Sequence, residues 1–142
     1  MTPTQQQLIR ESWQAVEPIQ DQAAELFYGR LFELEPPIAR LFRRTDMASQ
    51  RKLLMQTLTV VVKSIDRLEQ IVPAVEALGR RHAGYGVRPG HYATVGEALL
   101  WTLETGLGPA FTPDVREAWT AAYTTLATVM IDAAASVERA AA

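Results

Sequence analysis

The chain of 142 residues contains no cysteine and only two histidines. Without cysteine there can be no disulfide, no thiolate metal site and no cysteine nucleophile. The apolar run at residues 58–62 is interrupted by Thr59, and no apolar run of the chain is long enough to span a bilayer, so no membrane insertion is expected. The net charge is −2 and no basic block occurs, so no nucleic-acid partner is expected either.

Length and composition indicate one ordinary folded domain that spans residues 1–142. Hydrophobic residues make up 48% of the chain and charged residues 21%, which is typical of a folded globular protein. A chain of this size buries a core without help from disulfides or metals. The first seven residues are polar and lack the apolar stretch of a secretory signal, so a cytoplasmic location is expected.

Prolines, glycines and capping residues divide the chain into helices, and no segment alternates as a strand would, so an all-α fold is predicted. The first helix is expected to start at a capping box of Thr4 and Gln7 and to end before Pro18. The others are expected over 21–35, 37–42, from a cap at Thr45 or Asp46 to about 71, 73–83, 91–107, and from a cap at Thr112 to about 138. Gly29 lies inside the second helix, where close approach of another helix would explain a glycine.

Two of these helices carry one polar residue on an otherwise apolar face. Leu54, Leu58, Val61 and Ile65 follow Gln50 at helical spacing, and Val75 and Leu78 precede His82 in the same way. A polar group among apolar neighbours is costly unless it meets a partner. A flat, mostly apolar cofactor with a metal at its centre would supply a partner to both Gln50 and His82.

Several stretches together resemble the globin family. They are LFYGRLFELEP at 26–36, ARLF ending at Phe42, residues 50–55, LGRRHAGYGV at 78–87 and HYATVGEALL at 91–100. The resemblance covers essentially the whole chain and is nearest to neuroglobin-like and bacterial single-domain globins of the flavohaemoglobin and Vitreoscilla type. It implies the globin fold, a three-over-three helical sandwich, and haem b (iron protoporphyrin IX) as the cofactor.

The resemblance also implies roles for individual residues. His82 matches the proximal iron ligand, and Gln50, 32 residues earlier, matches the position of the distal histidine of many globins. Tyr28 matches a residue that points at the bound gas. The remaining matches are contacts of the haem: Phe42 at the corner after the short third helix, Leu54 on the distal side, Leu78, Val87 and Val95 packed on the porphyrin from the proximal side and the link, and Tyr92 near the proximal histidine.

The chemistry of these residues is consistent with such roles but leaves alternatives open. An iron-binding imidazole needs an acceptor for its other N–H, and the carbonyl of Leu78, one turn back, is a candidate. Without the family context, His82 would be read as an ordinary satisfied helix histidine. Tyr28 and Gln50 can both donate hydrogen bonds to a bound gas. The alternatives are a core tyrosine bonded to a backbone carbonyl and a solvated glutamine, and His91 is expected to be a surface or loop residue.

The implied function is the binding of dioxygen, carbon monoxide and nitric oxide, for oxygen binding, storage or transport. The alternatives are a nitric oxide dioxygenase that uses an external reductase, and a haem-based gas sensor, so enzymatic activity stays open. Because Gln50 replaces a distal histidine, an open sixth iron position is expected. Flavohaemoglobins carry a glutamate eleven residues past the position of Tyr123, where this chain has Ala134. Lys52, Arg80 and Arg81 are candidates for binding the haem propionates, or are simply solvated charges.

Overall fold

The computed structural model describes the chain over residues 1–141, with side chains over residues 1–137, and this part is helical throughout and free of strands. The α-helices are α1 (Pro3–Val16), α2 (Gln20–Leu34), α3 (Met47–Lys63), α4 (Val72–Gly84), α5 (His91–Leu107) and α6 (Pro113–Ala141). Short 3₁₀-helices link them: η1 (Glu17–Ile19), η2 (Pro36–Phe42), η3 (Leu68–Gln70) and η4 (Gly108–Ala110). The all-α prediction is confirmed. Among the described helices, none is both long enough and apolar enough to cross a membrane.

The helix starts follow local capping chemistry, with one correction. The capping box of α1 is formed by Thr2 and Gln5, whose side chains each accept the other's backbone N–H at 3.1 Å, and not by Thr4 and Gln7. Pro3 explains the earlier start, because proline suits the first helical position. As predicted, Asp46 caps α3 by accepting the N–H of Ala48 at 3.1 Å.

The predicted end of α3 near Ile71 is wrong. The helix ends at Lys63, and Ser64 leaves the helical conformation at φ −102° and ψ 11°. The prediction relied on the apolar stripe, which continues to Ile65. That side chain is only 2% exposed, but the turn after α3 carries it into the core. Ile65 is therefore apolar because it is buried in the core, and its spacing from Val61 does not mean that it is helical.

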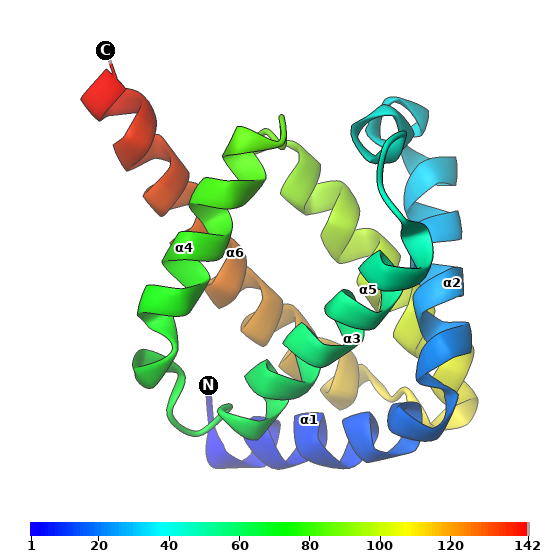
Figure 1. The fold of residues 1–142 in the computed structure, drawn as a ribbon. Helices are drawn as coiled ribbons and strands as arrows, with labels where there is room; N and C mark the ends of the chain where they lie inside the picture. The colour runs from blue at the N-terminus through cyan, green and yellow to red at the C-terminus, as the bar shows by residue number, and fades with distance from the viewer. Residues whose placement is uncertain (142) are drawn as a thin grey trace.

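The helices pack as two layers, α1, α3 and α4 against α2, α5 and α6. The main contacts between the layers are those of α4 with α6, α1 with α6 and α2 with α3, and Figure 1 shows α4 crossing α6. Gly79 makes the α4–α6 crossing possible, because a Cβ there would lie 2.5 Å from the carbonyl oxygen of Met130. The glycine that the α4–α6 crossing requires is thus Gly79, in α4.

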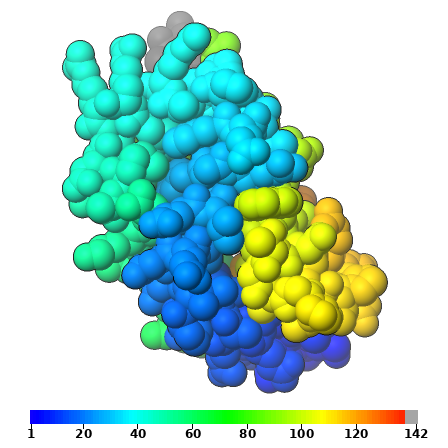
Figure 2. Space-filling view, turned by 90° about the vertical axis from the view of Figure 1, so that its right-hand side faces the viewer, coloured from blue at the N-terminus to red at the C-terminus, as the bar shows by residue number. Residues whose placement is uncertain are grey.

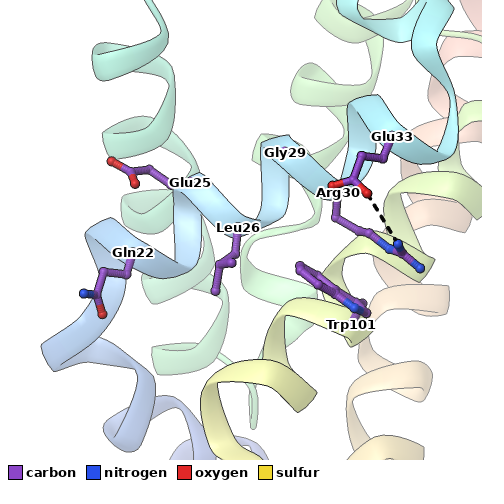
Figure 3. A pocket seen from close by; sticks show the side chains of 7 residues that line it. All are labelled: Gln22, Glu25, Leu26, Gly29, Arg30, Glu33 and Trp101. Carbon is purple, nitrogen blue, oxygen red and sulfur yellow. Dashed lines mark ion pairs between the residues drawn. The ribbon is translucent and has the colours of Figure 1, made fainter.

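Gly29 does not mark a helix contact, so that expectation is wrong. A Cβ on Gly29 would meet nothing within 4 Å, because the residue borders an open hollow of about 430 Å³ on the outer face of α2. Figure 3 shows the hollow, in which the Arg30 guanidinium lies 5.1 Å from the ring centroid of Trp101 and pairs with Glu33 at 3.7 Å. Neither His82 nor Gln50 lines this hollow.

The apolar interior falls into two clusters. The larger one joins residues of α1, α2, α3, α5 and α6, among them Ile9, Phe27 and Leu103. The smaller one is centred on Val75, Tyr92, Ala127 and Met130, from α4, α5 and α6. The principal helix partner of α4 is α6, and neither α3 nor α5 is among its main contacts. The core is therefore divided between the α3 side and the α4 side of the molecule.

Candidate functional site

His82 lies in the last turn of α4 and is half-buried. Its Nδ1 is 2.8 Å from the carbonyl oxygen of Leu78. A carbonyl only accepts, so Nδ1 carries the hydrogen and donates it, as the sequence predicted. Burial lowers the pKa of His82, the bond to Leu78 raises it, and the positive charge of Arg81 lowers it further. The neutral ring leaves Nε2 as a free lone pair, which no described residue engages, and such a nitrogen suits a metal.

Gln50 and Tyr28 meet on the α2–α3 side. The Gln50 amide Nε2 donates a hydrogen bond to the Tyr28 hydroxyl oxygen at 3.0 Å. Burial raises the pKa of Tyr28, and this bond lowers it by a smaller amount. Because Gln50 donates to the phenol oxygen, the phenol keeps its own hydrogen for another acceptor, and no described residue accepts it. The alternative of a core tyrosine bonded to a backbone carbonyl is thus not what the structure shows.

Aromatic rings surround the Tyr28 phenol. The ring of Phe42, brought in by η2, lies 5.6 Å from that of Tyr28 and 5.6 Å from that of Phe32, between centroids. Phe27 packs edge-on against Tyr28 at 5.0 Å. The packing of Phe32 beside Tyr28 was not predicted, although its spacing of four residues from Tyr28 places both on one helix face. Such apolar walls strengthen any polar contact that Tyr28 makes.

The other predicted contact residues divide between the two clusters. Leu54 and Val95 pack against the larger cluster, and Leu78 and Val87 pack against the smaller one, which includes Tyr92. All but Tyr92 are only half-buried, although they are apolar. Two apolar walls, one near the free Nε2 of His82 and the other bearing the Tyr28 hydroxyl, fit a flat apolar group with a metal at its centre. The residues present thus suit a haem.

Tyr92 is anchored through its backbone. The Tyr123 hydroxyl donates to the Tyr92 carbonyl at 2.7 Å, and burial raises the pKa of both phenols, with the neighbouring Tyr92 adding to the shift at Tyr123. A cavity of about 30 Å³ lies beside Tyr92, lined also by Val87, Pro89, Ile131, Ala134 and Ala135. The small side chain of Ala134 thus borders open space and carries no polar group toward the proximal side.

His91, expected to be a surface or loop residue, is the first residue of α5, and its side chain is only 19% exposed. Its Nδ1 accepts the backbone N–H of Arg88 at 2.9 Å, and its Nε2 lies 3.4 Å from a carboxylate oxygen of Glu35. The Thr94 hydroxyl donates to the same carboxylate at 2.6 Å. His91 therefore fastens the start of α5 to the end of α2. The sequence could not indicate this, because Glu35 is 56 residues away.

Tyr85 was also missed. Its ring centroid lies 6.5 Å from that of His82, while the side chain is 67% exposed. The spacing of three residues was an available signal, since residues i and i+3 share a helix face. The predicted propionate partners Lys52, Arg80 and Arg81 are exposed, and none of them forms an ion pair with a described residue.

At the candidate site, His82 is the only described side chain that offers a nitrogen ligand to a metal. Over the part of the chain that the structure describes, no three side chains of the types His, Cys, Asp or Glu gather into a group that could hold a metal ion. A protein-only metal site usually needs three or four ligands. A metal at His82 would therefore need its remaining ligands from a cofactor.

Comparison with curated proteins gives relatives of two kinds. A neuroglobin of Tetraodon nigroviridis is 32% identical over 137 residues, which cover 87% of this chain and 86% of that protein. A flavohemoprotein of Bacillus subtilis is 36% identical over 107 residues, or 74% of this chain, and one of Vibrio cholerae is 39% identical over 108. The chain spans only 27% of the length of these flavohemoproteins.

Solved structures and a family model agree with these relatives. An engineered carbene transferase based on a candidate nitric oxide dioxygenase of Rhodothermus marinus superposes with a TM-score of 0.88 at 28% identity, covering 99% of this chain and 97% of that one. A bacterial globin of Campylobacter jejuni gives 0.85 at 26% identity, covering 97% and 99%. The model of the globin family matches residues 25–130. With its layered helices and the lone histidine of α4, this chain belongs to the globin family.

Proposed function

We propose that the chain, as a single globin domain over residues 1–142, binds haem b and reversibly takes up dioxygen, carbon monoxide and nitric oxide. Globins as a family bind haem and diatomic gases. The observation that carries the proposal is the state of His82, whose Nδ1–H is held by Leu78 at 2.8 Å while Nε2 is left free. That hydrogen bond fixes the tautomer and the orientation that an iron ligand needs, and it makes the ring a stronger donor.

The haem would be held mainly by apolar contacts. Phe42 and Leu54 would cover one side, and Leu78, Val87, Tyr92 and Val95 would cover the other. Exposed cations on α3 and α4 (Lys52, Arg80, Arg81) would meet the carboxylates of the haem edge. When bound, the haem supplies an iron that accepts a diatomic gas. The preference of the protein for one gas over another would come from the residues around the position of the gas.

Tyr28 and Gln50 would set the preference for polar gases. Gln50 holds the phenol oxygen, so the phenol hydrogen of Tyr28 can point at the gas position. Dioxygen draws electron density when it binds and becomes a better acceptor than carbon monoxide. A hydrogen bond contributes roughly 0.5–1.5 kcal/mol net, and about 1.5–3 kcal/mol where a charged group takes part. The pair would therefore favour retention of dioxygen.

A second candidate function is that of a nitric oxide dioxygenase. It is favoured by the flavohemoprotein relatives and by the Rhodothermus marinus structure, whose parent is a candidate nitric oxide dioxygenase. In that reaction nitric oxide and dioxygen combine with one electron to give nitrate, and an external reductase restores the electron. Tyr28 and Gln50 would serve both functions. The test is the amount of nitrate formed per globin molecule when nitric oxide is added. An enzyme forms nitrate over many turnovers when a reductase is present and over a single turnover when it is absent, whereas a storage protein does not turn over.

An absorption spectrum of the purified protein with added haem tests the proposal. We expect haem uptake, an open sixth position in the ferrous form, and a shifted Soret band with carbon monoxide. His82→Ala should abolish stable ferrous binding or make it depend on added imidazole, whereas His91→Ala should leave the spectrum unchanged because His91 pairs with Glu35. A spectrum unchanged in His82→Ala and lost in His91→Ala would reverse the assignment.

A further inference from the structure

The charges of the chain are unevenly distributed. Residues 40–63 and 80–88 contain nine of the chain's 14 lysines and arginines but only one of its 16 acidic residues, Asp46. The rest of the chain is left with five basic and 15 acidic residues. The formal charge is therefore +8 on these two segments and −10 elsewhere, although the whole chain carries only −2.

The basic side chains of the two segments are available to a partner. All but the half-buried Arg51 are exposed, and none forms an ion pair with a described residue. By contrast, Arg10, Arg30, Arg67 and Arg116, which lie elsewhere, are all paired with carboxylates. Among the side chains that the structure describes, the unpaired cations are thus concentrated in the segments that flank the candidate haem site.

The fold brings the start of the first segment and the end of the second segment together at one end of the molecule. A Cβ on Gly86, in the link after α4, would lie 3.2 Å from the Leu41 side chain of η2. Figure 1 shows the cyan corner after α2 and the light-green link after α4 at the same end of the molecule. In Figure 2, side chains of the cyan region around residues 40–50 stand off the surface as separate projections. We call Arg40, Arg43, Arg44, Arg88 and Tyr85 the cationic face.

Tyr85 makes this face more than a charged surface. It is a large ring, 67% exposed, in the link that also bears Arg88, and its centroid lies 6.5 Å from that of the His82 ring. Tyrosine and arginine are among the residues that most often dominate the binding energy of protein interfaces. A partner seated on Tyr85 would therefore be separated from the proposed iron ligand by little more than one aromatic ring.

We propose that the cationic face docks an acidic one-electron donor protein, which reduces the ferric globin by passing it a single electron. This inference rests on the proposed haem function. The four arginines of the face, set against a remainder of the chain that is rich in acidic residues, would orient an acidic protein toward the face during encounter. The same negative remainder repels the extended polyanion of a nucleic acid or an anionic membrane. The exposed aromatic ring also favours a protein surface.

A plant-type [2Fe–2S] ferredoxin, which is small and acidic, serves as the probe. Two measurements are made on the haem-loaded protein: calorimetric binding of oxidised ferredoxin, which involves no electron transfer, and stopped-flow reduction by reduced ferredoxin. The test variant is Arg43→Gln/Arg44→Gln/Arg88→Gln, and its matched control is Arg10→Gln/Arg67→Gln/Arg116→Gln, with the same change of net charge. Photoreduced lumiflavin, which is uncharged, controls for any change in the haem itself.

At low ionic strength the test variant should bind oxidised ferredoxin about ten-fold more weakly than the wild type, and reduced ferredoxin should reduce it about ten-fold more slowly. The affinity and the rate of the control variant should both stay within about two-fold of the wild-type values. The difference should vanish near 1 M salt, where the screening length is about 3 Å. Tyr85→Ala should also weaken the binding of oxidised ferredoxin by about ten-fold, and Tyr85→Phe should not. Reduction by lumiflavin should be equal in all variants.

Equal ferredoxin binding in the test and control variants, or rates independent of salt, would overturn the docking proposal. Binding to phosphatidylserine vesicles with none to ferredoxin would overturn it in favour of a membrane surface. Failure of the proposed haem function would give a different result, because the protein would then take up no haem. Calorimetry on the haem-free protein would still report whether ferredoxin binds the cationic face.

Discussion

The hydrogen bond between Gln50 and Tyr28 makes the two residues unequal. Gln50 donates to the phenol oxygen at 3.0 Å, which leaves the phenol hydrogen as the one directed at a gas. Tyr28→Phe removes that donor, whereas Gln50→Leu removes only the group that orients it. We therefore expect Tyr28→Phe to raise the dioxygen dissociation rate more than Gln50→Leu does.

The magnitude follows from the value of one hydrogen bond. A loss of about 1.4 kcal/mol corresponds to a ten-fold faster dissociation, so Tyr28→Phe should raise the rate by about ten-fold. Gln50→Leu removes only the orientation of the phenol, which we set at about 0.5 kcal/mol, the low end of the net value of a hydrogen bond. Its dioxygen dissociation rate should therefore rise by roughly two- to three-fold. Because Gln50 acts through Tyr28, the double variant should fall short of the sum of the two effects in free energy.

Stopped-flow displacement of dioxygen by carbon monoxide measures all three variants. Tyr85→Phe and Gln56→Leu are matched controls, because both side chains are exposed and should leave the rate unchanged. Carbon monoxide dissociation should respond less to every variant, since carbon monoxide is the poorer acceptor. A dioxygen rate in Tyr28→Phe that is equal to or below the wild-type rate would refute the assignment of Tyr28 as the chief donor.

Three further predictions concern proton binding and packing. Burial raises the pKa of Tyr28 above its ordinary value of about 10, so its phenol should stay protonated and the dioxygen dissociation rate should be constant from about pH 6 to about pH 9; a rate that rises within this range would contradict it. Gly79→Ala should lower the free energy of unfolding in urea by about 1 kcal/mol, because overpacking against the backbone of α6 costs about 1–3 kcal/mol and a gain of about 1 kcal/mol in helix propensity offsets part of it. Gly84→Ala, in the same helix with nothing within 4 Å, should not destabilise the protein. Tyr123→Phe should cost about 0.5–1.5 kcal/mol in the same assay, because the Tyr92 carbonyl, in the first turn of α5, loses the hydrogen bond from the Tyr123 hydroxyl, and an unchanged midpoint would show that water replaces the hydroxyl.

Contacts within one helical turn could be predicted from the sequence. The bond from His82 to the carbonyl of Leu78 joins residues four apart, and helix geometry alone brings them together. The cap of α3 at Asp46 and the bounds of α5 at His91 and Leu107 were predicted for the same reason. The start of α1 was misjudged within the same local chemistry, since Pro3 made Thr2 the better cap.

Contacts between distant segments depended on how the helices pack. Tyr28 and Gln50 are 22 residues apart, and the sequence indicated two hydrogen-bond donors but not that one holds the other. The end of α3 was misplaced because burial of Ile65 depends on the tertiary fold and not on the helical period.

The sequence by itself determined the helical class and most helix bounds, because spacing and capping act over one or two turns of chain, and its resemblance to the globins indicated His82 as the candidate iron ligand. Only the tertiary structure decided which glycine lets α4 approach α6, that His91 is tied to Glu35, and that two separate basic segments meet beside Gly86. Those outcomes depend on helix crossings, which arise from the packing of many side chains at once and leave no periodic trace along the chain.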